Sequence, residues 1–147
     1  MNWTATEAAS RTEPWLIVLD DNPGDARLIS EAISRSRPEV RIEILARSDV
    51  LLARLQDLEN SPDATLPALL FVDVNVPPLS GHIVLSFLRT NERLGAVPSV
   101  VLSGALVEED RQRFQASGAS DVLAKPATFA ELRHLVDLAL DRFLPPS

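Results

Sequence analysis

The run Leu69–Val72 constrains the fold of this chain more than any other stretch. Its four apolar residues end at a carboxylate, Asp73, and two prolines and Gly81 follow. A short, continuous apolar run bounded by turn residues indicates a strand that is buried on both faces, as in parallel sheets. Because an ionised carboxylate is costly to bury, we expect Asp73 to lie at an open edge of the sheet. The alternative is an ordinary strand that ends in Asp because Asp is a common turn residue.

Three further apolar runs favour the first interpretation, because each also stops at a side chain capable of chemistry. They are Leu16–Leu19 before Asp20 and Asp21, Ser99–Leu102 before Ser103, and Asp121–Ala124 before Lys125. Segments with helical periodicity separate the runs, which is typical of parallel strands whose carboxyl ends meet at one edge. In open α/β sheets that edge is where sites are built. We therefore predict one site that contains Asp20, Asp21, Asp73, Ser103 and Lys125.

A fifth strand and five helices complete the predicted fold. Apolar and charged residues alternate over 40–45, which indicates a half-exposed edge strand. Three helices are expected over 25–36, 82–93 and 108–117, with a turn at 94–98. Another helix is expected to begin at a cap, Ser48 or Asp49, and to end at the polar loop 59–67. The last is expected over 128–143, where Thr128 and Glu131 form a capping box. Right-handed crossovers and one reversal of winding give an α/β fold, a doubly wound five-stranded parallel sheet in the order 2-1-3-4-5 with helices on both faces.

Length and composition limit the classes of protein to consider. A chain of 147 residues that is 46% hydrophobic is expected to form one domain, over 15–144, behind a flexible tail at 1–14. The formal charge of −7 argues against nucleic acid as the main partner, and the absence of Cys excludes disulfides and cysteine-ligated zinc. No basic-then-apolar start and no apolar run of about 18 residues occurs, so we expect neither signal peptide nor membrane span, and a cytoplasmic location.

Three carboxylates at one edge of a sheet need a counter-charge. Two carboxylates 4 Å apart repel each other by about 4 kcal/mol at an effective dielectric of 20, so either protons stay bound or a cation enters. A set of oxygen ligands suits a hard ion, and Mg²⁺ fits best because it needs few protein ligands. A carboxylate beside Mg²⁺ can attack a phosphorus atom, so this arrangement suits phosphoryl transfer.

Three other residues of the predicted site each have two interpretations. Lys125 is the single lysine among 14 basic residues, and an ammonium, unlike a planar guanidinium, places one compact charge on one oxygen. Either the site requires that point charge, or the one lysine lies there by chance. Ser103 is either a donor to a phosphoryl oxygen or an ordinary strand-end serine. Asn75 either offers its backbone carbonyl to the metal or is a turn residue.

These motifs, in this order and spacing, resemble a known family. Asp-Asp at 20–21, Asp-x-Asn-x-Pro-x-x-x-Gly over 73–81, Ser103 and the Lys-Pro pair at 125–126 are similar to the receiver domain of two-component response regulators, which has a flavodoxin-like fold. The resemblance covers about residues 15–143. The stretch Asp-Asp-Asn-Pro-Gly-Asp over 20–25 resembles the phytochrome-associated subgroup of these receivers.

The resemblance implies a role for each site residue. Asp73 would accept a phosphoryl group from a phosphohistidine of a sensor histidine kinase. Asp21 and Asp73 would bind Mg²⁺ directly with the Asn75 carbonyl, and Asp20 would act mainly through water. Ser103 and Lys125 would hold the phosphoryl oxygens, and the Lys125–Pro126 peptide would be cis.

It also implies what kind of protein this is. A stand-alone signalling phosphoacceptor is expected rather than an enzyme, since it would promote only its own Mg²⁺-dependent phosphoryl transfer and dephosphorylation. Its output would be contact with another protein through the surface of the fourth helix, fifth strand and fifth helix, whose apolar residues are compatible with a homodimer.

One departure from the family keeps two alternatives open. Receivers usually carry Tyr or Phe three residues before the Lys, where this chain has Val122 and contains no Tyr. The usual readout of phosphorylation is therefore in doubt, and an adaptor with a receiver fold that no longer switches is one alternative. The other is an aspartate-nucleophile phosphatase of the haloacid dehalogenase type, although that family has an acid where this chain has Asn75.

Overall fold

A five-stranded sheet forms the centre of the computed structural model, which describes residues 14–146. The strands are β1 (Trp15–Leu19), β2 (Arg41–Leu45), β3 (Leu69–Asp73), β4 (Ser99–Ser103) and β5 (Asp121–Ala124). All neighbours pair in parallel in the order β2-β1-β3-β4-β5. This confirms the predicted topology. The predicted flexible tail, apart from Pro14, lies outside the described residues.

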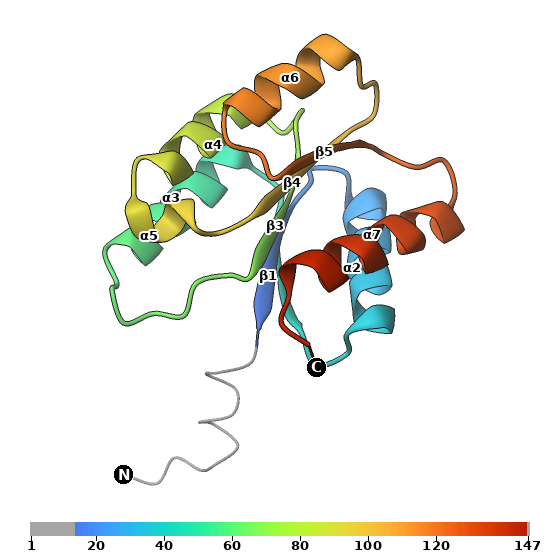
Figure 1. The fold of residues 1–147 in the computed structure, drawn as a ribbon, viewed down its shortest axis with the longest axis horizontal. Coiled ribbons are helices and arrows are strands. Elements are labelled where there is room, and N and C mark those ends of the chain that lie inside the picture. The colour runs from blue at the N-terminus through green and yellow to red at the C-terminus, as the bar shows by residue number, and fades with distance from the viewer. Residues whose placement is uncertain (1–13, 147) are drawn as a thin grey trace, which may run out of the picture.

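Helices cover both faces of the sheet (Figure 1). Those that the structure describes are α2 (Pro23–Ser36), α3 (Ser48–Glu59), α4 (Gly81–Arg89), α5 (Glu92–Gly95), α6 (Glu108–Ala116) and α7 (Phe129–Phe143). α2 and α7 pack on one face, and the other four pack on the opposite face. Within residues 14–146, no helix combines the length and the apolar character needed to cross a bilayer.

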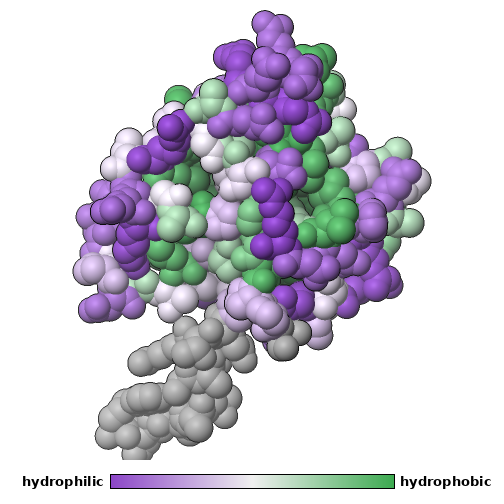
Figure 2. Space-filling view, in the orientation of Figure 1, coloured by the Kyte–Doolittle hydropathy of each residue, from purple (hydrophilic) through white to green (hydrophobic). Residues whose placement is uncertain are grey.

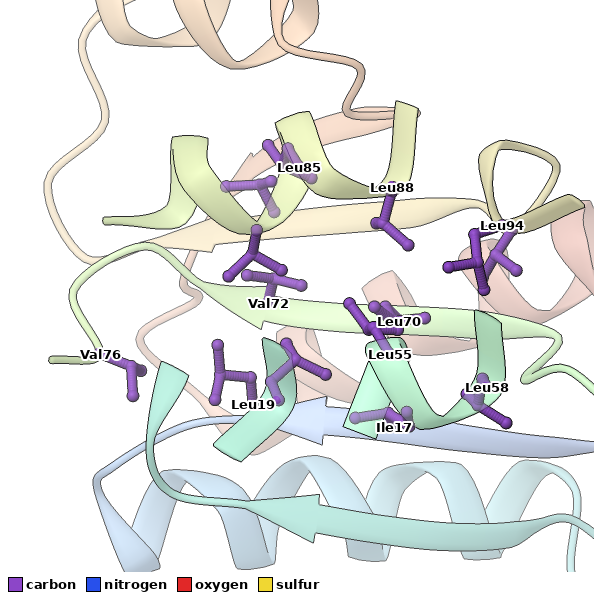
Figure 3. Packing of buried hydrophobic residues seen from close by; sticks show 14 of the residues in the cluster. Ile17, Leu19, Leu55, Leu58, Leu70, Val72, Val76, Leu85, Leu88 and Leu94 are labelled. Carbon is purple, nitrogen blue, oxygen red and sulfur yellow. The ribbon is translucent and has the colours of Figure 1, made fainter. Parts of the chain in front are cut away.

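The core consists of two apolar layers, one on each face of the sheet. Figure 3 shows the larger layer, in which side chains of β1 and β3 meet leucines of α3, α4 and α5; among them are Ile17, Leu19, Leu70, Val72, Leu55, Leu58, Leu85, Leu88 and Leu94. Because both faces are covered, every residue of β1, β3 and β4 is buried. The edge strand β2 is half-exposed, as its alternating sequence predicted.

The prediction of one continuous helix over 82–93 is wrong after residue 89. α4 ends at Arg89, and residues 92–95 form the separate short helix α5. The Asn91 side chain accepts a hydrogen bond from the Leu94 N–H at 3.0 Å, and this cap starts a new helix where a turn was expected. Leu94 is thereby placed in the core, where it is fully buried.

The predicted caps of two helices had different outcomes. Thr128 caps α7 and accepts from the Glu131 N–H at 3.1 Å, as expected. Neither Ser48 nor Asp49 is the N-cap of α3, because Arg47 occupies that position. The buried Ser48 hydroxyl instead accepts from the Leu79 N–H at 2.6 Å, so it joins the start of α3 to the loop after β3.

Candidate functional site

The site lies at the carboxyl edge of the two neighbouring strands β1 and β3. Their register places Leu19 opposite Val72, so the next residues, Asp20 and Asp73, reach the same edge. The Asp20 N–H continues the pairing with β2 by donating to the Leu45 carbonyl at 3.0 Å. Both carboxylate residues are buried, with only 2% and 8% of their surfaces exposed. The convergence predicted from strand topology is therefore present.

A local turn orients each of these two carboxylates. Asp20 Oδ1 accepts from the Asn22 N–H at 2.9 Å, and Asp73 Oδ1 accepts from the Asn75 N–H at 3.0 Å. Asx residues commonly bind the amide two positions on in this way. One oxygen of each carboxylate is occupied by its own loop, and the other, Oδ2, faces Lys125. The backbone N–H of Asn75 thus helps to orient the Asp73 carboxylate.

Lys125 joins the carboxylates through its ammonium group. Nζ donates to Asp20 Oδ2 at 2.9 Å, to Asp25 Oδ2 at 2.9 Å and to Asp73 Oδ2 at 3.0 Å. Its backbone N–H donates to the Ser103 carbonyl at 2.8 Å, which holds the residue against the end of β4. The side chain thus crosses the edge of the sheet from β5 to β1.

The cis peptide expected at Lys125–Pro126 is wrong. Within residues 14–146 the cis bond is Pro77–Pro78, in the loop after β3. Lys125 reaches the carboxylates from a trans peptide, because the hydrogen bond between its N–H and Ser103 already places it at the edge of the sheet.

The electrostatics of the site follow from burial and from Lys125. Burial raises the pKa of Asp20, against the lowering effects of the Asn22 amide and of Lys125. Burial alone would lower the pKa of Lys125, but its hydrogen bonds to Asp20, Asp25 and Asp73 raise that pKa well above the ordinary value of 10.5. Lys125 is therefore a cation at every physiological pH.

Three of the carboxylates form a group that could hold a metal ion. Asp20, Asp21 and Asp73 each present an oxygen, and these oxygens lie within 4.8 Å of one another. Asp21 is exposed at the rim, whereas the other two are buried. An all-oxygen set without nitrogen or sulfur donors fits a hard divalent cation. The residues present therefore fit the metal predicted from the sequence.

Ser103 and Val122 belong to β4 and β5, the two strands next to β3 on the side away from β1. Ser103 ends β4, is 5% exposed and pairs with Ala124, next to Lys125. Val122 is fully buried in the apolar layer under α3–α6. Its backbone carbonyl accepts a hydrogen bond from the Arg111 guanidinium of α6. At the position where the family usually has an aromatic ring, a small side chain is enclosed in the core.

The prediction from sequence missed Asp25 as a site residue. It lies in the first turn of α2, where an acid is favourable beside the positive end of the helix dipole, so its presence there needed no site to explain it. The available signal was the Asp-Asp-Asn-Pro-Gly-Asp stretch, which ends at Asp25.

The sequence of this chain is similar to those of known regulators. The model of the response regulator receiver domain matches residues 16–137. The probable methanogenesis regulatory protein FilR2 of Methanothrix harundinacea is 33% identical over 126 residues, which cover 85% of this chain and 81% of that protein. Response regulator Rcp1 of Synechocystis is 32% identical over 98 residues, 65% of each protein.

Solved structures share the fold. The phosphorylated cyanobacterial phytochrome response regulator RcpA superposes with a TM-score of 0.81 at 24% identity, over 92% of this chain and 97% of that one. The Mn²⁺-bound form of Rcp1 superposes with a TM-score of 0.77 at 23% identity, over 91% of this chain and 97% of that one. Because the family model covers most of the sequence and the fold agrees, this chain belongs to the response regulator receiver domain family, a family of signalling proteins.

Proposed function

We propose that this protein is a phosphoacceptor of a two-component system, in which Asp73 receives a phosphoryl group from the phosphohistidine of a sensor histidine kinase. One observation carries this proposal. The Asp73 carboxylate ends the central strand with a lysine Nζ 3.0 Å from its Oδ2 and with two further carboxylates beside it. Such a carboxylate is held in one orientation next to a cation that can offset the charge of an incoming phosphoryl group.

The transfer would use the residues of the site as follows. A carboxylate oxygen of Asp73 attacks phosphorus, the O–P bond forms as the P–N bond of the donor breaks, and the electron pair of that bond returns to the imidazole nitrogen. The Asn75 N–H keeps Asp73 oriented. Lys125 Nζ and the Ser103 hydroxyl then donate to phosphoryl oxygens. The chain would thus promote only its own phosphorylation, and later hydrolysis by water.

A divalent metal is part of the proposal, and we propose Mg²⁺. The Asp21 and Asp73 carboxylates would hold it together with the Asn75 carbonyl, with Asp20 supporting it through water. When bound, the ion offsets negative charge on the phosphoryl oxygens. The three carboxylates within 4.8 Å of one another support this, as does the similarity to Rcp1, whose structure was solved in an Mn²⁺-bound form.

The output would be contact with another protein through the face formed by α6, β5 and α7. Figure 2 shows hydrophilic side chains gathered over α6. The neighbouring hollow between β5 and α7, of about 590 Å³, is lined in large part by apolar residues, among them Leu123, Leu135, Leu138 and Phe143. Leu138 is 58% exposed, so a homodimer or a target protein would bind on this side. The proposal includes the cytoplasmic location expected from the sequence.

Phosphorylation of the intact protein tests the proposal. The protein is incubated with Mg²⁺ and acetyl phosphate and then weighed by mass spectrometry. Wild type should gain one phosphoryl group and Asp73→Asn should gain none, while the control Asp63→Asn, which neutralises an exposed acid of the loop before β3, should react like wild type. A phosphoryl group on Asp73→Asn, mapped to another residue, would contradict the assignment.

A further inference from the structure

Lys125 has a third carboxylate partner that the proposed phosphoryl transfer does not use. Besides Asp20 and Asp73, its Nζ donates to Asp25 Oδ2 at 2.9 Å. An ammonium has three N–H donors, and here each one meets a different carboxylate. A phosphoryl oxygen can therefore gain a hydrogen bond from Lys125 only if one of these carboxylates gives up its own.

The exposure of the three partners indicates which one is released. The Asp20 side chain is fully buried and that of Asp73 is 10% exposed, whereas that of Asp25 is 42% exposed. Until the O–P bond forms, Asp73 is still an anion, so losing Lys125 at that stage would leave a buried charge unpaired at Asp20 or at Asp73, which is costly. Asp25 would exchange the ammonium for water, so its release is the least costly.

The structure also has room for that exchange. A cavity of about 220 Å³ lies between α2 and the start of α7, and Asp25 and Lys125 both line it. A water molecule takes up about 30 Å³ in the liquid, so the cavity holds several. Apolar residues, among them Leu28 and Phe129, form much of its wall. Because Asp25 lines this cavity and its side chain is already 42% exposed, it can turn away from Nζ and be hydrated there.

We propose that Asp25 is a positioning residue that occupies the third N–H of Lys125 until a phosphoryl oxygen replaces it. This rests on the proposed phosphorylation of Asp73. Before transfer, Asp25 holds the ammonium between α2 and the two buried carboxylates. As the donor's phosphoryl group approaches, this N–H of Lys125 donates to a phosphoryl oxygen instead of to Asp25, and the first turn of α2 loses its hydrogen bond to the site. Asp25 slows phosphorylation, because it competes with the incoming phosphoryl group for a hydrogen bond from Lys125.

The test compares rates of phosphorylation by acetyl phosphate at low donor concentration with Mg²⁺ present. Asp25→Ala should react about threefold to fivefold faster than wild type, the range expected for loss of one partly exposed ion pair. Asp25→Glu, which keeps a carboxylate, should return the rate towards that of wild type. The matched control is Glu31→Ala, which removes an acid from the same helix; Glu31 pairs with Arg35 at 3.0 Å rather than with Lys125. Its rate should equal that of wild type.

A role through Lys125 requires that the effect depend on Lys125. In a Lys125→Met background, adding Asp25→Ala should therefore produce no acceleration. An acceleration that persists there would overturn the inference, because Asp25 would then act only as a charge. A rate for Asp25→Ala at or below that of wild type would also overturn it and leave the phosphoacceptor function intact. If wild type itself takes up no phosphoryl group, the proposed function fails, and this inference with it.

Discussion

Replacing Lys125 by Met should reveal how strongly the carboxylates at this edge depend on one cation. Methionine has a side chain of similar length but carries no charge and donates no hydrogen bond. The change would remove three charge-assisted hydrogen bonds of 2.9, 2.9 and 3.0 Å. It would leave Asp20 fully buried and Asp73 nearly so, with no cation beside either of them.

The expected loss of stability follows from burial. Removing one partner of a buried ion pair costs about 3–5 kcal/mol, because the other charge stays buried without compensation. The Lys125 side chain is 20% exposed and Asp25 can be hydrated, so part of the charge remains accessible to water. We therefore expect Lys125→Met to lower the free energy of unfolding by about 2–4 kcal/mol at neutral pH without metal. Repulsion between Asp20 and Asp73 acts in the same direction.

The effect also has a defined pH dependence. Because the pKa of Lys125 is raised in the folded state, its contribution is fully present below the ordinary value of 10.5 and is lost only as pH rises through the folded-state pKa. At neutral pH the wild type therefore has the whole contribution. Burial already raises the pKa of Asp20, and without Lys125 this carboxylate can take up a proton in acid, so the deficit of the variant should be smaller at mildly acidic pH than at neutral pH.

Urea unfolding of both proteins in EDTA measures the loss. The control is Arg142→Met, which removes the exposed partner of Asp121 at 3.6 Å and should change the free energy of unfolding by less than about 1 kcal/mol. Added Mg²⁺ should stabilise Lys125→Met more than wild type, since a bound cation replaces the missing charge. A loss below about 1 kcal/mol, or an equal loss at neutral and mildly acidic pH, would refute this reasoning.

Two further substitutions test the metal site and the position three residues before the lysine. Asp21→Ala should weaken Mg²⁺ binding about tenfold or more in titration calorimetry, with Asp63→Ala as the exposed control, because Asp21 supplies one of three clustered carboxylates. Unchanged affinity would mean that the metal is bound without Asp21. Val122→Tyr should lower the free energy of unfolding in urea by about 1–3 kcal/mol, since the ring must enter a filled core. No loss would place the ring in solvent at the edge of β5.

The topology could be predicted from sequence because the strongest signals are local. The strands β1, β3 and β4 consist mainly of apolar residues, and helical segments separate them. That alternation leaves few arrangements, and the observed strand order is the one it favoured. Because all strands run in parallel, the residues after them necessarily reach one edge. That ground alone predicts one site with Asp20, Asp21, Asp73, Ser103 and Lys125.

Features that depend on one tertiary contact could not be predicted. The short helix α5 begins at a single Asn91 cap in a segment too short to show a helical period. Ser48 has the residue type of a helix cap, yet its hydroxyl binds Leu79, 31 positions away in the chain. Sequence spacing contains no information on such a contact.

The hydrogen bonds of the site carboxylates are likewise of two kinds, local ones that the sequence pattern indicates and one that depends on the fold. Asp20 and Asp73 each precede an asparagine by two residues, and in both loops the amide of that asparagine binds Oδ1. This half of the geometry is local and repeats as Asp-x-Asn. The other half belongs to Lys125, which meets Asp25 across 100 positions of sequence. That contact exists because α2 starts at the carboxyl end of β1, which two strands, β3 and β4, separate from β5. From sequence alone, an acid in the first turn of this helix has two explanations, a favourable interaction with the helix dipole or an ion pair with the lysine. Only the fold shows that Asp25 pairs with Lys125.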